Sequence, residues 1–235
     1  MQPRRRAEIM TAAALHHVRL FPLTGTLLLP GTFLPLNVFE LRYRELVADA
    51  MKDDRRIGMI QPLAPASDNF GPVVGDAERP PLYGVGCVGE VVECDPQADG
   101  RFWIVLRGES RFRVVRELPL DEGGYRRVLA DLAVFAADLE EPGREIEIAD
   151  FLATADRFRR ARGLEFDMDL LASLPAPQAV NALCAALPLE PAEKQALLEA
   201  AGLEIRRDLL AGLLEMQLTT PAWEPRPPYS SPSVN

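Results

Sequence analysis

The residue types that most often bind metal ions or act as nucleophiles are scattered in this sequence. His16 and His17 are adjacent, and adjacent side chains on a strand point to opposite faces, so the pair does not predict a shared metal ion. Cys87 and Cys94 belong to no C-x-x-C pair, and Cys184 makes the number of thiols odd. This pattern favours free cysteines in a reducing cytoplasm, packed as small core residues.

Two carboxylate pairs and one glycine motif look like parts of active sites, but their positions argue against such roles. Asp53–Asp54 and Glu140–Glu141 are expected at helix boundaries or in loops, where acidic side chains are easily solvated, so acid–base catalysis is not indicated. The pattern Gly84-x-Gly86-x-x-Gly89 matches a dinucleotide fingerprint, yet it lies inside an expected strand. We therefore predict no catalytic residue, metal ion or cofactor at these positions.

The sequence lacks the residues that ATP hydrolysis and serine–lysine peptide hydrolysis require. No G-x-x-x-x-G-K-[ST] motif and no Gly-Lys dipeptide occur, so the backbone cradle and lysine that hold nucleotide phosphates are missing. A serine nucleophile would need a nearby lysine with a depressed pKa. The two lysines are Lys52, expected at a helix end, and Lys194, expected in an exposed turn. These features predict a protein that is not an enzyme.

Composition and charge limit the possible partners. The 235 residues carry a formal net charge of -9, which makes nucleic acid an unfavourable partner. The sequence has no run of about 18 uncharged apolar residues that would span a bilayer. We expect a cytoplasmic protein with a flexible arm at 1–17, whose true start is Met1 or Met10, and a disordered, proline- and serine-rich tail at 221–235.

Between these ends, hydrophobic periodicity divides the chain into a β-rich subdomain, 18–138, and a helical bundle, 139–220. Runs of β-branched and aromatic residues predict antiparallel strands, and a helix at 38–52 and a long loop at 62–81 interrupt them. Glycines inside one strand favour a small, tightly curved barrel. The strands are expected at 18–29, 32–36, 55–62, 82–94, 101–108, 111–118 and 125–135.

The start of the predicted helix in the β-rich half carries the candidate binding residues. Asn37 is a good N-cap, and Glu40 follows three residues later, as in a capping box. Phe39 and Tyr43 share one face at i, i+4 spacing, which predicts core packing for both. Glu40 and Arg42 are either an ion pair that locks the helix to the barrel or contacts to a ligand.

Apolar residues recur with a helical period after the Glu-Pro-Gly turn at 141–143, and this predicts a bundle of four helices. Gly163 ends the first helix as a left-handed cap, and Pro188 stops the second. Pro191 opens the third helix, which ends at Gly202. The fold class expected from the whole chain is therefore α+β, with a strand-rich half followed by a helical one.

Several of these segments together resemble the N-terminal, substrate-recruiting domain of Lon proteases. The resemblance covers residues 18–218 and rests on "FPL…LLPGTFLPLNVFELRYRELV", "IGMIQ", "YGVGCVGEV", "VLRGESRFRVV" and "ALPLEPAEKQALLEAAGLEIRRDLLAGLLE". It implies a PUA-like pseudo-barrel followed by a helical bundle, and a module that holds unfolded or tagged polypeptides. A Lon protease continues into an ATPase module and a peptidase, whereas this chain stops about where the connecting helix would begin.

Two hypotheses of function follow from this resemblance. The first is a polypeptide-binding adaptor or chaperone-like holder, acting alone or with a protease or chaperone, whose apolar surface lies near 62–81 and 38–52 and includes Phe39, Glu40, Arg42 and Tyr43. The second is an RNA-binding protein, because some PUA-like folds bind RNA. Its basic face would use strand arginines, among them Arg101, Arg107, Arg111, Arg113, Arg116, Arg126 and Arg127.

Overall fold

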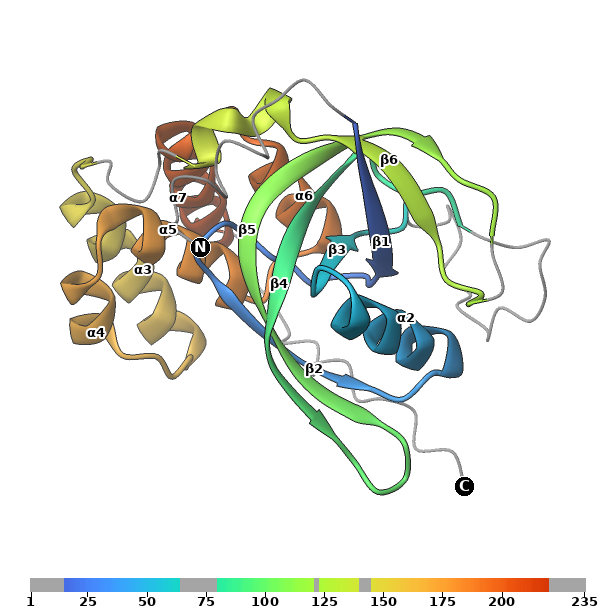
Figure 1. Ribbon diagram of the computed structural model, residues 1–235. Helices are drawn as coiled ribbons and strands as arrows, with labels where there is room; N and C mark the ends of the chain where they lie inside the picture. Colours follow the sequence, from blue (N-terminus) through green and yellow to red (C-terminus); the bar gives the residue numbers. More distant parts are fainter. Residues whose placement is uncertain (1–14, 64–79, 121–122, 140–144, 220–235) are drawn as a thin grey trace.

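The computed structural model describes residues 15–63, 80–120, 123–139 and 145–219 (Figure 1). Six strands come first and five bundle helices follow, so the predicted α+β class is confirmed. The strands and the helix between them are β1 (His16–Pro22), β2 (Phe33–Val38), α2 (Leu41–Lys52), β3 (Arg56–Ile60), β4 (Val85–Pro96), β5 (Phe102–Glu117) and β6 (Arg127–Asp131). After a 3₁₀ segment (Ala133–Leu139), the bundle contains α3 (Ala149–Arg162), α4 (Met168–Ser173), α5 (Ala176–Ala186), α6 (Pro191–Glu199) and α7 (Leu203–Thr219).

The sheet closes into a barrel because β5 is long enough to pair with two sets of neighbours. Its order is β2-β5-β4-β3-β1-β6, and β5 also pairs with β6, so five strands form a ring. The first part of β5 pairs with β2, and the last part pairs with β6. The prediction of two separate strands at 101–108 and 111–118 was therefore wrong, since one continuous strand passes through both.

The interior of the barrel is narrow, and this close packing is possible because Gly86 has no side chain. A small cluster fills it, in which Val18, Phe112 and Val128 are buried. A Cβ atom on Gly86 would lie 2.5 Å from the Phe112 ring and 2.5 Å from the Met59 carbonyl oxygen, so only glycine fits there. This confirms the curved barrel that the strand glycines predicted.

A second, larger core joins the strands to the helices. One cluster of buried residues contains side chains from the strands, from α2 and from every helix of α3–α7, including Ile57, Leu46, Phe158 and Leu210. Figure 1 shows these bundle helices gathered beside the strands, away from the hairpin that β4 and β5 extend. The bundle has one helix more than predicted, since the short α4 was missed. The left-handed cap predicted at Gly163 is confirmed by its φ of 62°.

The helix start predicted at Asn37 was wrong. Asn37 is exposed and lies in β2, where it is paired in register with Trp103 of β5. The strand ladder therefore continues to Val38, and α2 begins only at Leu41, with Glu40 at the N-cap and no side-chain cap bond. Main-chain pairing with β5 outweighs the local preference of asparagine for a cap. Pro35 lies in β2, an edge strand, as expected of a residue without an N–H.

A buried ion pair ties the barrel to the bundle. The Arg111 side chain on β5 is 1% exposed, and its Nη2 atom donates to Asp138 Oδ1 at 2.7 Å. Its Nη1 atom donates to the carbonyl oxygens of Leu198 and Ala200 at the end of α6, at 2.9 and 2.5 Å. The guanidinium also lies 4.4 Å from the centre of the Phe135 ring. One side chain thus holds the strand, the 3₁₀ segment and a bundle helix together.

We predict that Arg111→Met lowers the free energy of unfolding by about 3–5 kcal/mol, because it leaves the Asp138 carboxylate buried without its charge partner. The double variant Arg111→Met/Asp138→Leu should recover most of that loss, since no charge is then buried. Urea denaturation followed by circular dichroism measures both. A single variant as stable as the parent would show that the pair does not hold the two halves together.

Candidate functional site

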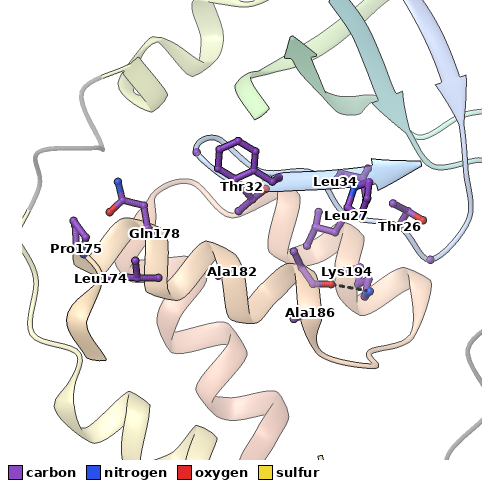
Figure 2. Close-up of a pocket in the computed structure, with 15 residues that line it drawn as sticks. Thr26, Leu27, Thr32, Leu34, Leu174, Pro175, Gln178, Ala182, Ala186 and Lys194 are labelled. Atoms are coloured by element: carbon purple, nitrogen blue, oxygen red, sulfur yellow. Dashed lines mark hydrogen bonds between the residues drawn. The ribbon is translucent and has the colours of Figure 1, made fainter. Parts of the chain in front are cut away.

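An apolar groove of about 740 Å³ lies between the start of β2 and the helices of the bundle (Figure 2). One wall comes from residues 25–27 and 31–35, and the other from the α4–α5 turn, α5 and Lys194 of α6. The volume falls within the range of about 300–1,000 Å³ that ligand sites usually have. The groove is therefore formed by segments that are more than a hundred residues apart in sequence.

The kinked segment "LLLPGT" between β1 and β2 shapes the first wall. Thr32 Oγ1 donates to the Leu29 carbonyl at 2.8 Å, and Gly31 has a φ of 78°, so the chain turns sharply before β2. Gly108 of β5 allows the turn to approach, because a Cβ there would lie 2.0 Å from the Leu29 oxygen. The Asn181 side chain of α5 donates to the Pro30 carbonyl at 3.0 Å and fixes the turn against the bundle.

Small side chains on α5 keep the second wall open. Ala182, Ala185 and Ala186 line the groove, while the helix face that includes Val180 and Leu183 is buried in the core. Helix α5 has no charged residue, and Gln178 and Asn181 are its only polar side chains. A helix as apolar as this normally has most of its surface covered. That pattern is the one sequence signal that could have located the groove.

Strand β2 contributes an exposed aromatic ring and an unpaired edge. Phe33, which lines the groove, is 62% exposed, so much of its ring is open to solvent. Among the described strands, β5 alone pairs with β2. The second edge of β2 is therefore not occupied by another described strand.

Lys194 lies at the far end of the groove from Gln178, and it is not in the exposed turn predicted for it (Figure 2). It is 8% exposed, because α6 packs its middle turn against the core. Burial lowers the pKa of its ammonium group below the usual value. Its Nζ atom donates to the Ala185 carbonyl at 3.3 Å.

The residues predicted from the resemblance lie at the start of α2 and do not line the groove. Tyr43 is buried and stacks on Phe21 with ring centres 4.2 Å apart, which confirms its predicted core role. Phe39 is 54% exposed, so the core role predicted for it was wrong. Glu40 and Arg42 form an ion pair at 2.7 Å, and the Arg42 guanidinium lies 4.6 Å from the Tyr43 ring centre.

The predicted basic face is largely neutralised or buried. Arg111 is in the core with Asp138, as described above, so it cannot contact a nucleic acid. Arg101 pairs with Asp99 at 2.6 Å, and Arg107 pairs with Glu90 at 2.7 Å. The RNA hypothesis is therefore not favoured. The exposed Arg113 and Arg116 remain on the last part of β5, and Arg126 pairs with Glu117.

Metal and thiol chemistry find little support in the described part of the chain. Among residues 15–63, 80–120, 123–139 and 145–219, no group of three or more His, Cys, Asp or Glu side chains is placed to hold a metal ion. Cys87, Cys94 and Cys184 are free, and burial raises the pKa of Cys184 to about 12, which makes its thiol unreactive.

None of the described helices is long and apolar enough to cross a membrane.

Comparison with known families assigns residues 17–216 to the ATP-dependent protease La (LON) substrate-binding domain. The chain belongs to this family. It is 28% identical over 211 residues to Lon protease 2 of Myxococcus xanthus, and 29% identical over 209 residues to the Lon protease of Anaeromyxobacter dehalogenans. Each alignment covers 83% of the chain but only 23% and 22% of those proteases, respectively.

Solved structures of Lon N-terminal domains share the fold. A Lon N-terminal domain protein from Xanthomonas campestris is 23% identical, with a TM-score of 0.59 over 84% of this chain and 98% of that one. The N-terminal domain of the Lon protease of the Mycobacterium avium complex is 18% identical, with a TM-score of 0.61 over 85% and 98% of the two chains. The fold implied by the sequence resemblance is thus confirmed.

We predict that Tyr43→Ala lowers the free energy of unfolding by about 3 kcal/mol, because it removes a buried ring and leaves a cavity. Phe39→Ala, four residues earlier and exposed, should change it by less than about 0.5 kcal/mol. Thermal unfolding of both variants checks the difference. Equal losses would mean that Phe39 is also packed in the core.

Proposed function

We propose that this chain binds extended, apolar segments of polypeptide in the groove between β2 and α5 and does not cleave them. The observation that carries the proposal is an apolar groove bordered by an exposed phenylalanine and by alanines of α5. Apolar side chains of an unfolded segment gain about 25 cal/mol for each Å² that they bury there. Membership of a family described as substrate-binding supports the same reading.

The edge of β2 extends the proposal to the main chain. An extended segment laid along this strand can exchange backbone hydrogen bonds with it, which gives affinity with little sequence preference. Pro35 has no N–H to offer, so such pairing is incomplete and the apolar wall carries much of the binding. Weak, broad selectivity of this kind suits a module that recruits unfolded chains, as an adaptor or chaperone-like holder does.

The start of α2 is the rival surface for the same function. Phe39 and Leu41 are exposed there beside the Glu40–Arg42 ion pair. The expected loop at 62–81 falls mostly outside the described residues. Phe33 begins β2 and Phe39 directly follows it, and both phenylalanines are exposed. Phe33 lines the groove, whereas Phe39 does not. They therefore make a matched pair of test positions.

We predict that Phe33→Ala weakens binding of fluorescein-labelled, unfolded casein about tenfold, because a buried phenylalanine side chain is worth about 1.5–3 kcal/mol. Phe39→Ala should leave the affinity unchanged. Fluorescence anisotropy measures both, and thermal unfolding verifies that each variant is folded.

If Phe39→Ala weakened binding and Phe33→Ala did not, the binding surface would lie at the start of α2, and this result would contradict the groove. Affinity should also change little between low and moderate salt, because no counterions are released from phosphates when an apolar segment binds. Binding of RNA with a steep salt dependence, together with no binding of casein, would overturn the proposal in favour of the RNA hypothesis.

We also predict that the purified chain hydrolyses neither ATP nor casein. It has no phosphate-binding Gly-Lys pair. Within the described residues, the buried Lys194 donates to a carbonyl oxygen and not to a hydroxyl nucleophile. Release of phosphate and of casein fragments are the measurements. Cleavage that survives purification and disappears in Ser67→Ala, Ser110→Ala or Ser173→Ala would contradict this prediction.

A further inference from the structure

Lys194 is an unusual group for an apolar groove. Of the 15 described residues that line the groove, it is the only one with a charged side chain. It forms no ion pair with the described parts of the chain, although it is only 8% exposed. An ammonium group has three donors, and the Ala185 carbonyl accepts one at 3.3 Å. Burying a charge without a partner is costly.

The carboxylates nearest to Lys194 in sequence bind other groups of α6. Glu190 and Glu193 form a capping box at the start of α6, in which the Glu193 side chain accepts from the Glu190 N–H at 2.8 Å. Glu199 accepts from the Gln195 side chain at 2.7 Å. Glu190 and Glu193 thus satisfy the start of α6, Glu199 binds Gln195, and Lys194 is left lining the groove.

The groove has a direction, which Figure 2 shows. Leu174, Pro175 and Gln178 lie at one end of α5, and Ala186 and Lys194 lie at the other. The 11 residues of α5 span about 16 Å, which matches about five residues of extended chain. At the first end, the Oε1 atom of Gln178 is shielded from solvent and accepts no hydrogen bond from the described residues.

We propose that the groove binds the C-terminal end of a polypeptide, with the last few apolar side chains along α5 and the terminal carboxylate on Lys194. This inference rests on the proposed function and deepens it by naming the part of the client that is recognised. A carboxylate supplies the missing opposite charge, and charge-assisted hydrogen bonds of this kind are about twice as strong as neutral ones.

A chain terminus fits this position better than an acidic side chain within a chain. Lys194 lies where α5 has ended and residues 187–190 turn back into α6, so a segment laid along α5 reaches the ammonium at the end of its path. The alanines beside it leave room for small apolar side chains. A terminal carboxylate sits on the main chain itself and needs no acidic side chain in this apolar setting.

The test uses one fluorescein-labelled, eight-residue peptide that ends in Ala-Val-Ala-Ala, made with a free C-terminal carboxylate and as the C-terminal amide. The free acid should bind the parent chain about tenfold more tightly than the amide, as expected for loss of one charged hydrogen bond. Lys194→Met should bind both peptides equally, with the affinity of the amide. The other lysine of the chain, Lys52, is exposed on α2 and provides the matched control Lys52→Met.

Lys194→Met keeps the length and apolar stem of the side chain and removes an unpaired buried charge, so the variant should unfold at the same or a higher temperature. Equal binding of acid and amide by the parent, with both weakened by Phe33→Ala, would overturn the terminal-carboxylate inference and leave the groove intact. No effect of Phe33→Ala on either peptide would overturn the groove itself. An amidated peptide that ends in glutamate and binds as tightly as the free acid would show that an internal carboxylate is taken instead.

Discussion

The buried guanidinium of Arg111 is the contact on which the arrangement of the two halves depends. It leaves β5 where the barrel closes, pairs with Asp138 and binds the carbonyl oxygens at the end of α6. A charge buried this deeply is tolerated only when its hydrogen bonds are satisfied. These bonds therefore fix the distance between the strand and the end of the helix. Because α6 carries Lys194, the position of the groove is set by the same contact.

Other buried polar contacts reinforce this junction. The Gln195 side chain of α6 donates to the Val85 carbonyl of β4 at 3.1 Å, and Gln61 donates to the Pro191 carbonyl at 3.0 Å. Arg206 of α7 donates to Asn181, which in turn binds the Pro30 carbonyl. These bonds replace water that the backbone groups would otherwise need, and they orient the helices against the barrel. The groove remains open between them because alanines face the turn that precedes β2.

This arrangement fits the proposed binding of unfolded chains of varied sequence. The walls of the groove are preorganised by the core and by the polar junction, so a bound segment does not have to order them. In the proposed function, the apolar lining and the edge of β2 bind general features of an unfolded chain. Lys194, the one charged side chain among the described lining residues, is the group proposed to distinguish one kind of segment from another.

The amino-acid sequence by itself determined the elements whose pattern is local. The α+β class, the curved barrel, the left-handed cap at Gly163 and the buried position of Tyr43 follow from periodicity and from the backbone freedom of glycine. The family followed from short motifs spread along the chain. Each of these signals depends on neighbouring residues or on motifs that survive without knowledge of the packing.

Tertiary structure alone decided the features that depend on contacts between distant segments. Asn37 joined a strand because β5 offered it main-chain partners, although its local preference is a helix cap. Arg111 and Lys194 look like ordinary surface residues in sequence, and only the docking of α6 on the barrel buries them. The groove likewise lies between segments that no local pattern joins. Its existence, and the one charged side chain among its described lining residues, became visible only when the two halves were packed together.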